Sequence, residues 1–348
     1  MDQFASIPFL GQPMWMWLVF LGLVAVLLAF DLGILNRGSR EIGIRRSLGL
    51  SAFYMTLGLA FGGFVWLELG RQAGIEYLTG FIVEKSLAMD NVFVIAMIFG
   101  YLAIPRELQH RVLFWGILGV IVLRAIMIGA GAALVTEYAW VLYVFAAFLV
   151  FTGIRMLWAG DHEPDLSRNP VLRFSRRLFR VTDELHGERF FVHVPDPQTG
   201  RLRRAATPMF LALVLIEVAD VIFAVDSVPA IFAITTDAYL VYTSNIFAIL
   251  GLRALYFALA AILHRFAYLK QALAVLLVFI GGKVFVADLF GLDKVPPEWS
   301  LGITVAILAA GMGYSVWRTR NSAAAMAEQA MRDPAPGRLA PEGRSGLS

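Results

Sequence analysis

The sequence contains no cysteine, and only 16% of its 348 residues carry a charge. Without thiols the chain forms no disulfide and offers no thiolate to a soft metal or to redox chemistry. We also find no nucleophile motif, phosphate-binding loop or cofactor fingerprint, so we expect neither an enzyme nor a bound cofactor. The few histidines fall in predicted loops or at the ends of apolar runs, which argues against a zinc or copper site: His110, His162, His186, His193 and His264.

Apolar residues, by contrast, make up 59% of the sequence, and its mean hydropathy is +0.72. A soluble domain has no room to bury that much apolar surface, so the lipid bilayer must be its partner. A run of about 20 apolar residues crosses the hydrocarbon layer. The sequence therefore predicts an all-α polytopic membrane protein with about nine transmembrane helices, over residues 14–35, 50–69, 77–103, 111–135, 138–160, 208–234, 239–263, 271–290 and 299–317.

Basic residues are sorted to one side of these predicted helices. If the N-terminus lies outside, the predicted cytoplasmic segments hold 22 of the 29 lysines and arginines, and the opposite segments hold only Arg71 and Lys294. Cytoplasmic loops are typically enriched in these residues, so we predict a multi-pass protein of the bacterial inner membrane with the N-terminus outside and the C-terminus in the cytoplasm. This sorting, without aromatic interleaving, gives no reason to expect a nucleic-acid partner.

The longest predicted loop, residues 161–207, is basic and cytoplasmic. Its stretch 171–180 mixes apolar and cationic residues, as an interfacial helix on anionic lipid would, or as a plain connector obeying the positive-inside rule would. Residues 190–194 and 201–205 flank a Pro-Asp-Pro-Gln-Thr-Gly turn and predict a small hairpin. The tail 318–348 is rich in Ala, Pro, Gly and Arg, and we predict that it is disordered.

An internal repeat relates two sets of three helices. Aligning residues 84–99 with 220–235 places Glu84 on Asp220 and Asp90 on Asp226. Further along, other polar and small residues correspond: Arg124 with Arg253, Gly153 with Gly281 and Arg155 with Lys283. Because three is odd, the second copy enters the membrane from the opposite side, as in many transporters with inverted repeats.

This repeat divides the chain into six parts. Residues 1–76 form an N-terminal two-helix segment, 77–160 the first repeat, 161–207 the basic loop and 208–290 the second repeat. Residues 291–317 hold the last transmembrane helix, and 318–348 form the tail.

Charged residues inside the predicted helices suggest where the chemistry lies. A charge facing lipid costs about 2.5–3.5 kcal/mol, so such residues are expected to face one another or water. The helices contain six acids, Asp31, Glu84, Asp90, Glu217, Asp220 and Asp226, and five bases, Lys85, Arg124, Arg155, Arg253 and Lys283.

Oxygen atoms dominate this set, and Asn91 and Ser227 add a neutral oxygen directly after the second acid of each repeat. Carboxylate, amide and hydroxyl oxygens favour Mn²⁺, Mg²⁺ or Ca²⁺. Pro229 is placed to unwind its helix and free carbonyl ligands. The predicted metal ligands are Glu84, Asp90, Asn91, Glu217, Asp220, Asp226 and Ser227, with Arg124, Arg253 and Lys283 as compensating charges.

Several alternatives remain open for these residues. One alternative is that the acids and bases pair for structural reasons alone, because six nearly balance five. Asp31 is equally compatible with a ligand and with a solvated residue. The run Thr243-Ser244-Asn245 is suited either to supplying ligand oxygens or to hydrogen bonding between helices.

Three motifs carry a family resemblance. They are Glu84-Lys-Ser-Leu-Ala-Met-Asp90-Asn-Val-Phe, Glu217-Val-Ala-Asp220-Val-Ile-Phe-Ala-Val-Asp226-Ser-Val-Pro-Ala-Ile-Phe-Ala-Ile-Thr, and Tyr242-Thr-Ser-Asn-Ile-Phe-Ala-Ile-Leu-Gly-Leu-Arg-Ala-Leu-Tyr256. Over residues 10–317 the chain resembles the TerC family of integral membrane proteins. The resemblance implies an exporter with inverted repeats, with manganese efflux or metal homeostasis as its activity. The family name refers to tellurium resistance.

The leading hypothesis is therefore export of a divalent cation, Mn²⁺ before others, through a carboxylate site between the repeats. A rival hypothesis is a membrane scaffold without transport activity, acting in stress or tellurium resistance or in membrane-protein assembly. A third is oxyanion transport, in which Arg124 and Arg253 would be the ligands.

Overall fold

A computed structural model gives the fold of the chain. It describes residues 8–35, 44–158, 172–174, 177, 179, 181–182, 184–195, 202–259, 269–290 and 295–332, without the side chains of 32–35, 44, 269 and 319–332. The helices are α2 (Met14–Leu35), α3 (Ile44–Tyr101), α4 (Arg106–Glu137), α5 (Val141–Trp158), α7 (Pro208–Phe232), α8 (Ala238–Leu250), α9 (Leu252–Leu259), α10 (Leu269–Leu289) and α11 (Pro297–Arg332).

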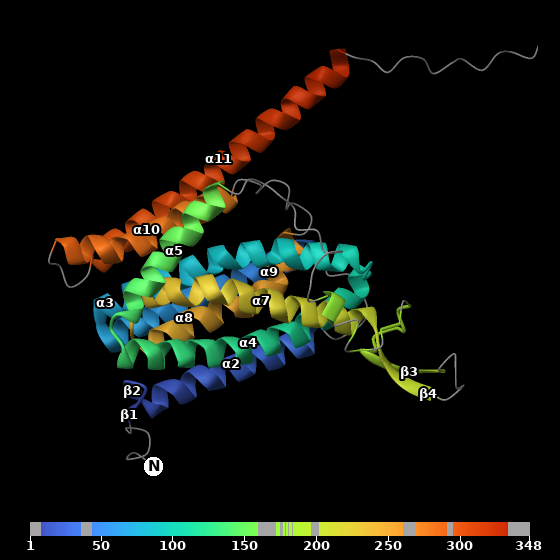
Figure 1. The fold of residues 1–348 in the computed structure, drawn as a ribbon, viewed down its shortest axis with the longest axis horizontal. Coiled ribbons are helices and arrows are strands. Elements are labelled where there is room, and N and C mark those ends of the chain that lie inside the picture. The colour runs from blue at the N-terminus through green and yellow to red at the C-terminus, as the bar shows by residue number, and fades with distance from the viewer. Residues whose placement is uncertain are drawn as a thin grey trace, which may run out of the picture.

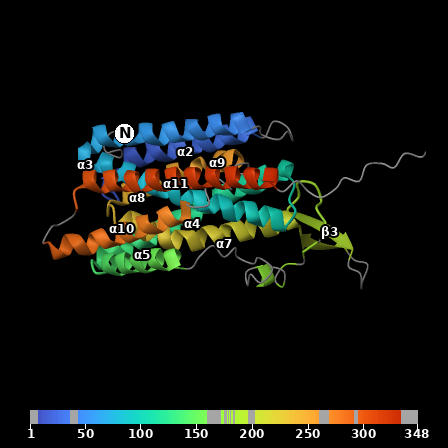
Figure 2. The same cartoon turned by 90° about the horizontal axis from the view of Figure 1, so that it is seen from above.

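The helices form two groups. Helices α2, α3, α4, α7 and α8 run alongside one another, and α5, α10 and α11 cross them obliquely (Figure 1). Seen from above, all of them extend along the same long axis (Figure 2). Eight candidate membrane-spanning helices lie among the described residues. The prediction of an all-α polytopic membrane protein is confirmed.

Helix α3 folds back on itself at Gly70, where φ is +89° and ψ is 175°. This conformation is open mainly to glycine, which has no Cβ. The two halves pack antiparallel, because the Tyr77 hydroxyl donates to the Gly58 carbonyl over 3.1 Å and the Phe61 and Tyr77 rings lie 5.7 Å apart. The predicted helices 50–69 and 77–103 are thus the two arms of one hairpin. With it, the described helices are sufficient for nine crossings.

The sequence predicted an interruption of a helix at Pro229, but the structure has an interruption in a different helix. Helix α7 continues through Pro229 as far as Phe232, so the expected unwinding at Pro229 is not observed. The neighbouring helices pack around this end of α7, where Ala230, Ile231 and Phe232 are almost fully buried. The break falls instead at Gly251, which separates α8 from α9 within the predicted helix 239–263.

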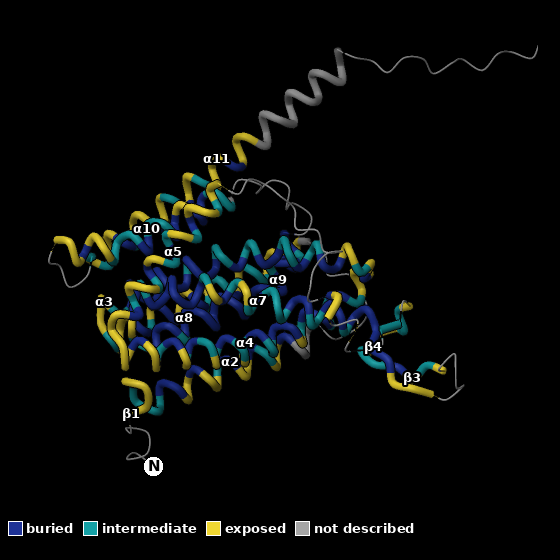
Figure 3. The backbone as a smooth tube through the Cα atoms, viewed as in Figure 1, coloured by how far each residue is buried: buried dark blue, intermediate teal, exposed yellow. Residues whose placement is uncertain are grey.

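Helices α8 and α9 form the central pass of the bundle (Figure 3). In an 18-residue apolar stretch of Ala238–Leu259, 83% of the residues are buried, against 22–44% in the corresponding stretches of the other candidate spans. The remaining helices therefore turn much of their apolar surface outward, as lipid-facing helices do. Polar side chains on α8 and α9 are held in the interior of the protein.

Helices α5 and α10 meet through reciprocal glycine contacts. A Cβ built on Gly153 would lie 2.6 Å from the Ala274 carbonyl oxygen, and one built on Gly281 would lie 2.5 Å from that of Ala146. A two-fold axis between α5 and α10 would exchange the two helices and so give each the same glycine contact with the other. The same axis would exchange the packing of α3 on α8 with that of α4 on α7, and both packings are present. The division into repeats stays a prediction that these contacts support.

Two antiparallel hairpins lie at opposite ends of the helices (Figure 1). One pairs β1 (Pro8–Phe9) with β2 (Gln12–Pro13). The other pairs β3 (Phe191–Pro195) with β4 (Leu202–Ala206), which confirms the hairpin predicted in the basic loop. Half of the predicted interfacial helix 171–180 lies outside the described residues, and of the other half residues 172–174 and 177 are helical.

The tail differs from its prediction, because α11 extends to Arg332 instead of ending before residue 318. Residues 321–332 are mostly Ala, Met, Glu and Gln, which favour helix, and Pro334 follows. The part of the tail after Arg332 lies outside the described residues.

Candidate functional site

Arg124 on α4 is the centre of a buried polar cluster. Its side chain is 1% exposed and forms ion pairs with Glu84 of α3 and Asp220 of α7. Nη2 lies 3.0 Å from Asp220 Oδ1 and Nε lies 3.1 Å from Asp220 Oδ2, while Nη1 donates to Glu84 Oε1. This bidentate fork is the strong, orienting geometry of arginine with a carboxylate. Arg124 thus pairs with two of the predicted ligands, and its role as a compensating charge stays a prediction.

Neutral groups complete the cluster. Arg124 Nη1 also donates to Ser227 Oγ over 2.9 Å and to Asn245 Oδ1 over 3.1 Å. The Asn91 amide donates to Asp220 Oδ1 over 3.2 Å. Helices α3, α4, α7 and α8 thus each contribute at least one side chain. For Asn245 the sequence left two roles open, supplying a ligand oxygen or hydrogen bonding between helices.

Helical spacing explains why these residues meet. Glu84 and Asn91 are seven residues apart on α3, and Asp220 and Ser227 are seven apart on α7. Seven residues make almost two full turns, so each pair lies on one face of its helix. The two pairs also occupy corresponding positions in the predicted repeats. The cluster is therefore built from one face of each repeat.

The cluster has one more negative than positive charge, because two carboxylates face one guanidinium. Its buried acceptor atoms Glu84 Oε2 and Asn91 Oδ1 have no hydrogen-bond partner among the described residues, nor has the donor Asn245 Nδ2. Buried polar atoms of this kind are costly and rare in native proteins. Two unpartnered acceptor oxygens in a negatively charged cluster suit a bound cation.

Three predicted ligands lie outside this cluster, and Asp90 and Asp226 are two of them. Asp90 follows Glu84 by six residues, and Asp226 follows Asp220 by six. Residues six apart point about 120° away from each other around a helix, so Asp90 and Asp226 do not lie on the face that forms the cluster. The Asp226 carboxylate lies beside Thr152 and Arg155, both on α5. The Asp90 carboxylate interacts electrostatically with Lys270 at the start of α10. Within the described residues, no three acids or histidines are grouped as a metal site in this conformation.

Glu217 lies in a separate groove between α4 and α7. Its carboxylate packs directly against Gly119, and its Oε2 atom is buried without a hydrogen-bond partner among the described residues. The groove is otherwise apolar and includes the exposed side chains of Trp115 and Val122. Glu217 thus lies beside the cluster rather than in it.

The other predicted compensating charges have partners elsewhere. Arg253 Nη2 lies 2.6 Å from Asp31 Oδ1, and the Phe114 ring faces the guanidinium at 5.9 Å. This pair joins α9 to the N-terminal helix α2. Lys283 donates to Ser300 Oγ of α11 over 2.9 Å. The structure therefore brings Arg124 alone of the three to the cluster.

Lys85 has a role that sequence reasoning missed. Its ammonium is buried and donates to the Ala248 carbonyl over 2.9 Å, next to the break at Gly251. A broken helix leaves carbonyls without their usual amide partners, and a lysine can satisfy one of them. The glycine at position 251 was the available signal, because it occurs within an apolar run.

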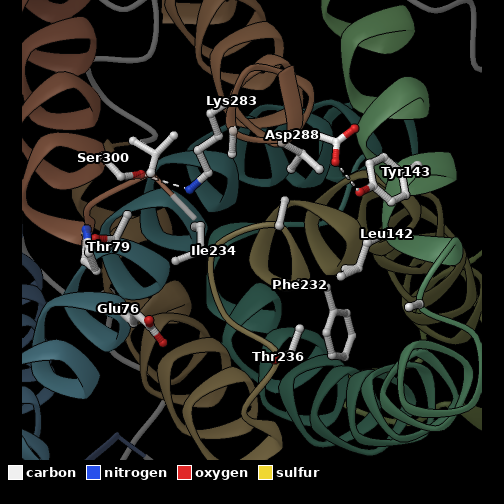
Figure 4. Close-up of a pocket in the computed structure, with 16 residues that line it drawn as sticks. Glu76, Thr79, Leu142, Tyr143, Phe232, Ile234, Thr236, Lys283, Asp288 and Ser300 are labelled. Atoms are coloured by element: carbon white, nitrogen blue, oxygen red, sulfur yellow. Dashed lines mark hydrogen bonds between the residues drawn. The ribbon is translucent and has the colours of Figure 1, made fainter. Parts of the chain in front are cut away.

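A pocket lined by both apolar and polar side chains lies at the end of the bundle near β1 and β2. It has a volume of about 350 Å³ and is lined by parts of α3, α5, α7, α10 and α11. Figure 4 shows Lys283 reaching toward Ser300, with Glu76 and Asp288 on opposite sides. Nothing in the sequence indicated this pocket, because its lining residues come from several helices and from the loops between them.

Known proteins match most of the chain. Residues 69–323 match the integral membrane protein TerC family. A Myxococcus xanthus protein named "Uncharacterized membrane protein STKORF319" is 42% identical over 91% of this chain and 96% of its own length. Two proteins named "Putative membrane-bound redox modulator Alx", from Salmonella typhi and Escherichia coli (strain K12), are 44% identical over 88% of this chain and 95% of their own lengths. No solved structure matches.

Proposed function

This chain belongs to the TerC family of integral membrane proteins, and from that premise we propose that it exports a divalent metal cation, Mn²⁺ before others, through the Arg124 cluster. The observation that carries the proposal is the pair of corresponding carboxylates, Glu84 and Asp220, buried beside unpartnered acceptor oxygens. Such groups are the ligands that hard divalent cations prefer. Intramembrane acids of this kind typically mark ion pathways.

Arg124 gives the site a way to stay stable when empty. Its guanidinium offsets the two carboxylates, which would otherwise repel each other in a medium of low dielectric constant. An arriving divalent cation supplies two positive charges to the same oxygens. The cation and the guanidinium then compete for Glu84 and Asp220, so cation binding favours withdrawal of Arg124. Alternating access between the repeats would follow from that exchange.

The remaining predicted ligands belong to the proposed pathway along which the cation reaches and leaves the cluster. Asp90 and Asp226 lie off the shared face, where each can meet the ion in another conformation. Glu217 is placed to assist or to carry protons. The choice of Mn²⁺ over Mg²⁺ and Ca²⁺ comes from the family resemblance, because oxygen ligands suit all three.

The geometry disfavours the other two hypotheses. Arg124 is already bound to two carboxylates, which leaves little of its charge for an oxyanion. A scaffold has no need of buried acceptor atoms without partners, since these destabilise the fold. The relatives' name refers to redox modulation, but this chain has no cysteine for thiol–disulfide exchange.

We place the chain in the bacterial inner membrane with the N-terminus outside. The β3–β4 hairpin and the rest of the basic loop then lie in the cytoplasm. Arg203 and Arg204 on β4 are exposed there, where anionic lipid headgroups are within reach of the loop.

Flux of Mn²⁺ into vesicles that contain the purified protein tests the proposal. Wild type is compared with Glu84→Gln and Asp220→Asn at matched protein level, and with Glu68→Gln as a control acid exposed at a helix end. We expect flux in the wild type and the control and less than a tenth of it in the two cluster variants.

Unchanged flux in both cluster variants would refute the site. Absence of wild-type flux for Mn²⁺, Mg²⁺ and Ca²⁺ alike would favour the scaffold, and uptake of tellurite instead would favour the oxyanion hypothesis.

A further inference from the structure

The pocket near β1 and β2 lies in line with the Arg124 cluster. Thr79 lines the pocket and precedes Glu84 by five residues on α3, while Phe232 lines it and follows Ser227 by five on α7. Five residues span about 7.5 Å along a helix. The same two helices therefore lead from the cluster to the pocket, and both do so in the direction of β1 and β2.

The position of the pocket identifies its side of the membrane. Gln12 on β2 donates to Asp237 over 2.8 Å, which ties the N-terminal hairpin to the segment just after the pocket residue Thr236. The β3–β4 hairpin lies at the other end of the helices (Figure 1). With the N-terminus outside, the pocket opens on the outer face.

The charges in the pocket are mixed. Glu76 is 7% exposed and accepts a hydrogen bond from Gln72 over 3.0 Å. Asp288 accepts from the Tyr143 hydroxyl over 3.2 Å. Lys283 adds one positive charge to the same pocket, so the three groups together carry one negative charge. A divalent cation entering the pocket meets attraction from two carboxylates and repulsion from one ammonium.

We propose that this pocket is the outer mouth of the cation pathway, and that Lys283 lowers its affinity for the divalent cation so that exported ions leave. An exporter needs weak binding on the side of release, whereas two carboxylates without a nearby base would retain the ion. Lys283 corresponds in the repeat to Arg155, which lies near Asp226. This inference rests on the proposed function for its ligand, but the accessibility of the pocket is independent of transport.

Chemical labelling of single introduced cysteines tests whether the pocket opens on the outer face. The natural chain has no cysteine, so each introduced thiol is the sole target. Ala233, which follows the last residue of α7, lines the pocket, and Ala230, about one turn earlier on α7, is fully buried. A membrane-impermeant thiosulfonate added to the outer side should modify Ala233→Cys and leave Ala230→Cys unmodified, as read from the mass of the intact protein. Failure to modify Ala233→Cys, or modification from the inner side alone, would overturn the assignment.

Inhibition by external Mn²⁺ tests Lys283. In Lys283→Gln the pocket retains both carboxylates without the ammonium, so external Mn²⁺ should inhibit export at about a tenfold lower concentration. The control is Arg71→Gln, which removes a positive charge from the same end of the bundle, since Arg71 is an exposed partner of Glu298 outside the pocket. We expect no shift in the control.

The two proposals fail in different ways. An unchanged inhibition constant in Lys283→Gln, with normal wild-type export, would refute the role of Lys283 and leave the proposed function in place. Absence of wild-type export would refute the proposed function, while the labelling of Ala233→Cys would still decide whether the pocket opens outward.

Discussion

Arg124 shows how a single buried charge can organise a membrane protein. It contacts two acids, a hydroxyl and an amide on three other helices. In a medium of low dielectric constant each of these groups would be costly alone, and together they compensate most of that cost. The fold therefore depends on Arg124 at the same place where the proposed transport does.

Replacing Arg124 tests this dependence. Arg124→Met leaves Glu84 and Asp220 uncompensated, and the loss of one partner from a buried ion pair costs about 3–5 kcal/mol. We expect a clear fall in the thermal unfolding temperature of the purified protein in detergent.

The double variant Arg124→Met with Glu84→Gln serves as the control. It removes charge of both signs, so its unfolding temperature should lie above that of Arg124→Met alone. Equal stability of Arg124→Met and wild type would show that the ion pairs do not hold the fold.

Sequence analysis predicted the main residues of the cluster but not their grouping. The correspondence of Glu84 with Asp220 is visible in the sequence, and so is Arg124 as a counter-ion. The exclusion of Asp90 and Asp226 depends on which helix face turns inward, and apolar sequence does not specify this. Arg253 pairs with an acid of α2, outside the repeats, so the internal alignment gave no hint of it.

At the scale of helices, the contact between α5 and α10 depends on small residues. Gly281→Ala would bring a methyl group against the Ala146 carbonyl, whereas a Cβ at the adjacent Gly282 would meet nothing within 4 Å. Overpacking costs about 1–3 kcal/mol. We expect Gly281→Ala to lower the unfolding temperature and Gly282→Ala to leave it unchanged, and equal effects of the two would contradict the close packing.

The turn in α3 provides a second prediction at this scale. Gly70 has a backbone conformation that costs a residue with a Cβ about 1–3 kcal/mol. Gly70→Ala should therefore destabilise the protein in thermal unfolding. Gly63→Ala is the matched control, because a Cβ there meets no atom within 4 Å and its φ is not positive. A stable Gly70→Ala would indicate a different turn.

Hydropathy predicted the helices well because the bilayer imposes their length. It did not predict how they are interrupted. Pro229 lacks an amide, yet the end of α7 is buried among its neighbours and stays helical. Gly251 within its apolar run was a signal of a break, but the sequence did not indicate its partner, the Lys85 ammonium that donates to the Ala248 carbonyl. Interruptions of this kind are decided by tertiary partners.

For the whole molecule, the sorting of basic residues makes a prediction about orientation. Leu10, between β1 and β2, and Leu202 on β4 are both exposed at opposite ends of the helices. In single-cysteine variants, Leu10→Cys should react with an impermeant thiol reagent from outside only, and Leu202→Cys from inside only. The reverse pattern would invert the topology and place the pocket of Lys283 on the cytoplasmic side.

In the whole molecule, two corresponding helix faces are proposed to form one cation site around Arg124. The most direct test is a titration of the purified protein with Mn²⁺, followed by electron paramagnetic resonance, in which bound Mn²⁺ loses the sharp signal of the free ion. Wild type should bind, Asp220→Asn should bind at least tenfold more weakly, and Glu68→Gln should bind as wild type does. Equal binding by wild type and Asp220→Asn, or none by wild type, would contradict the account.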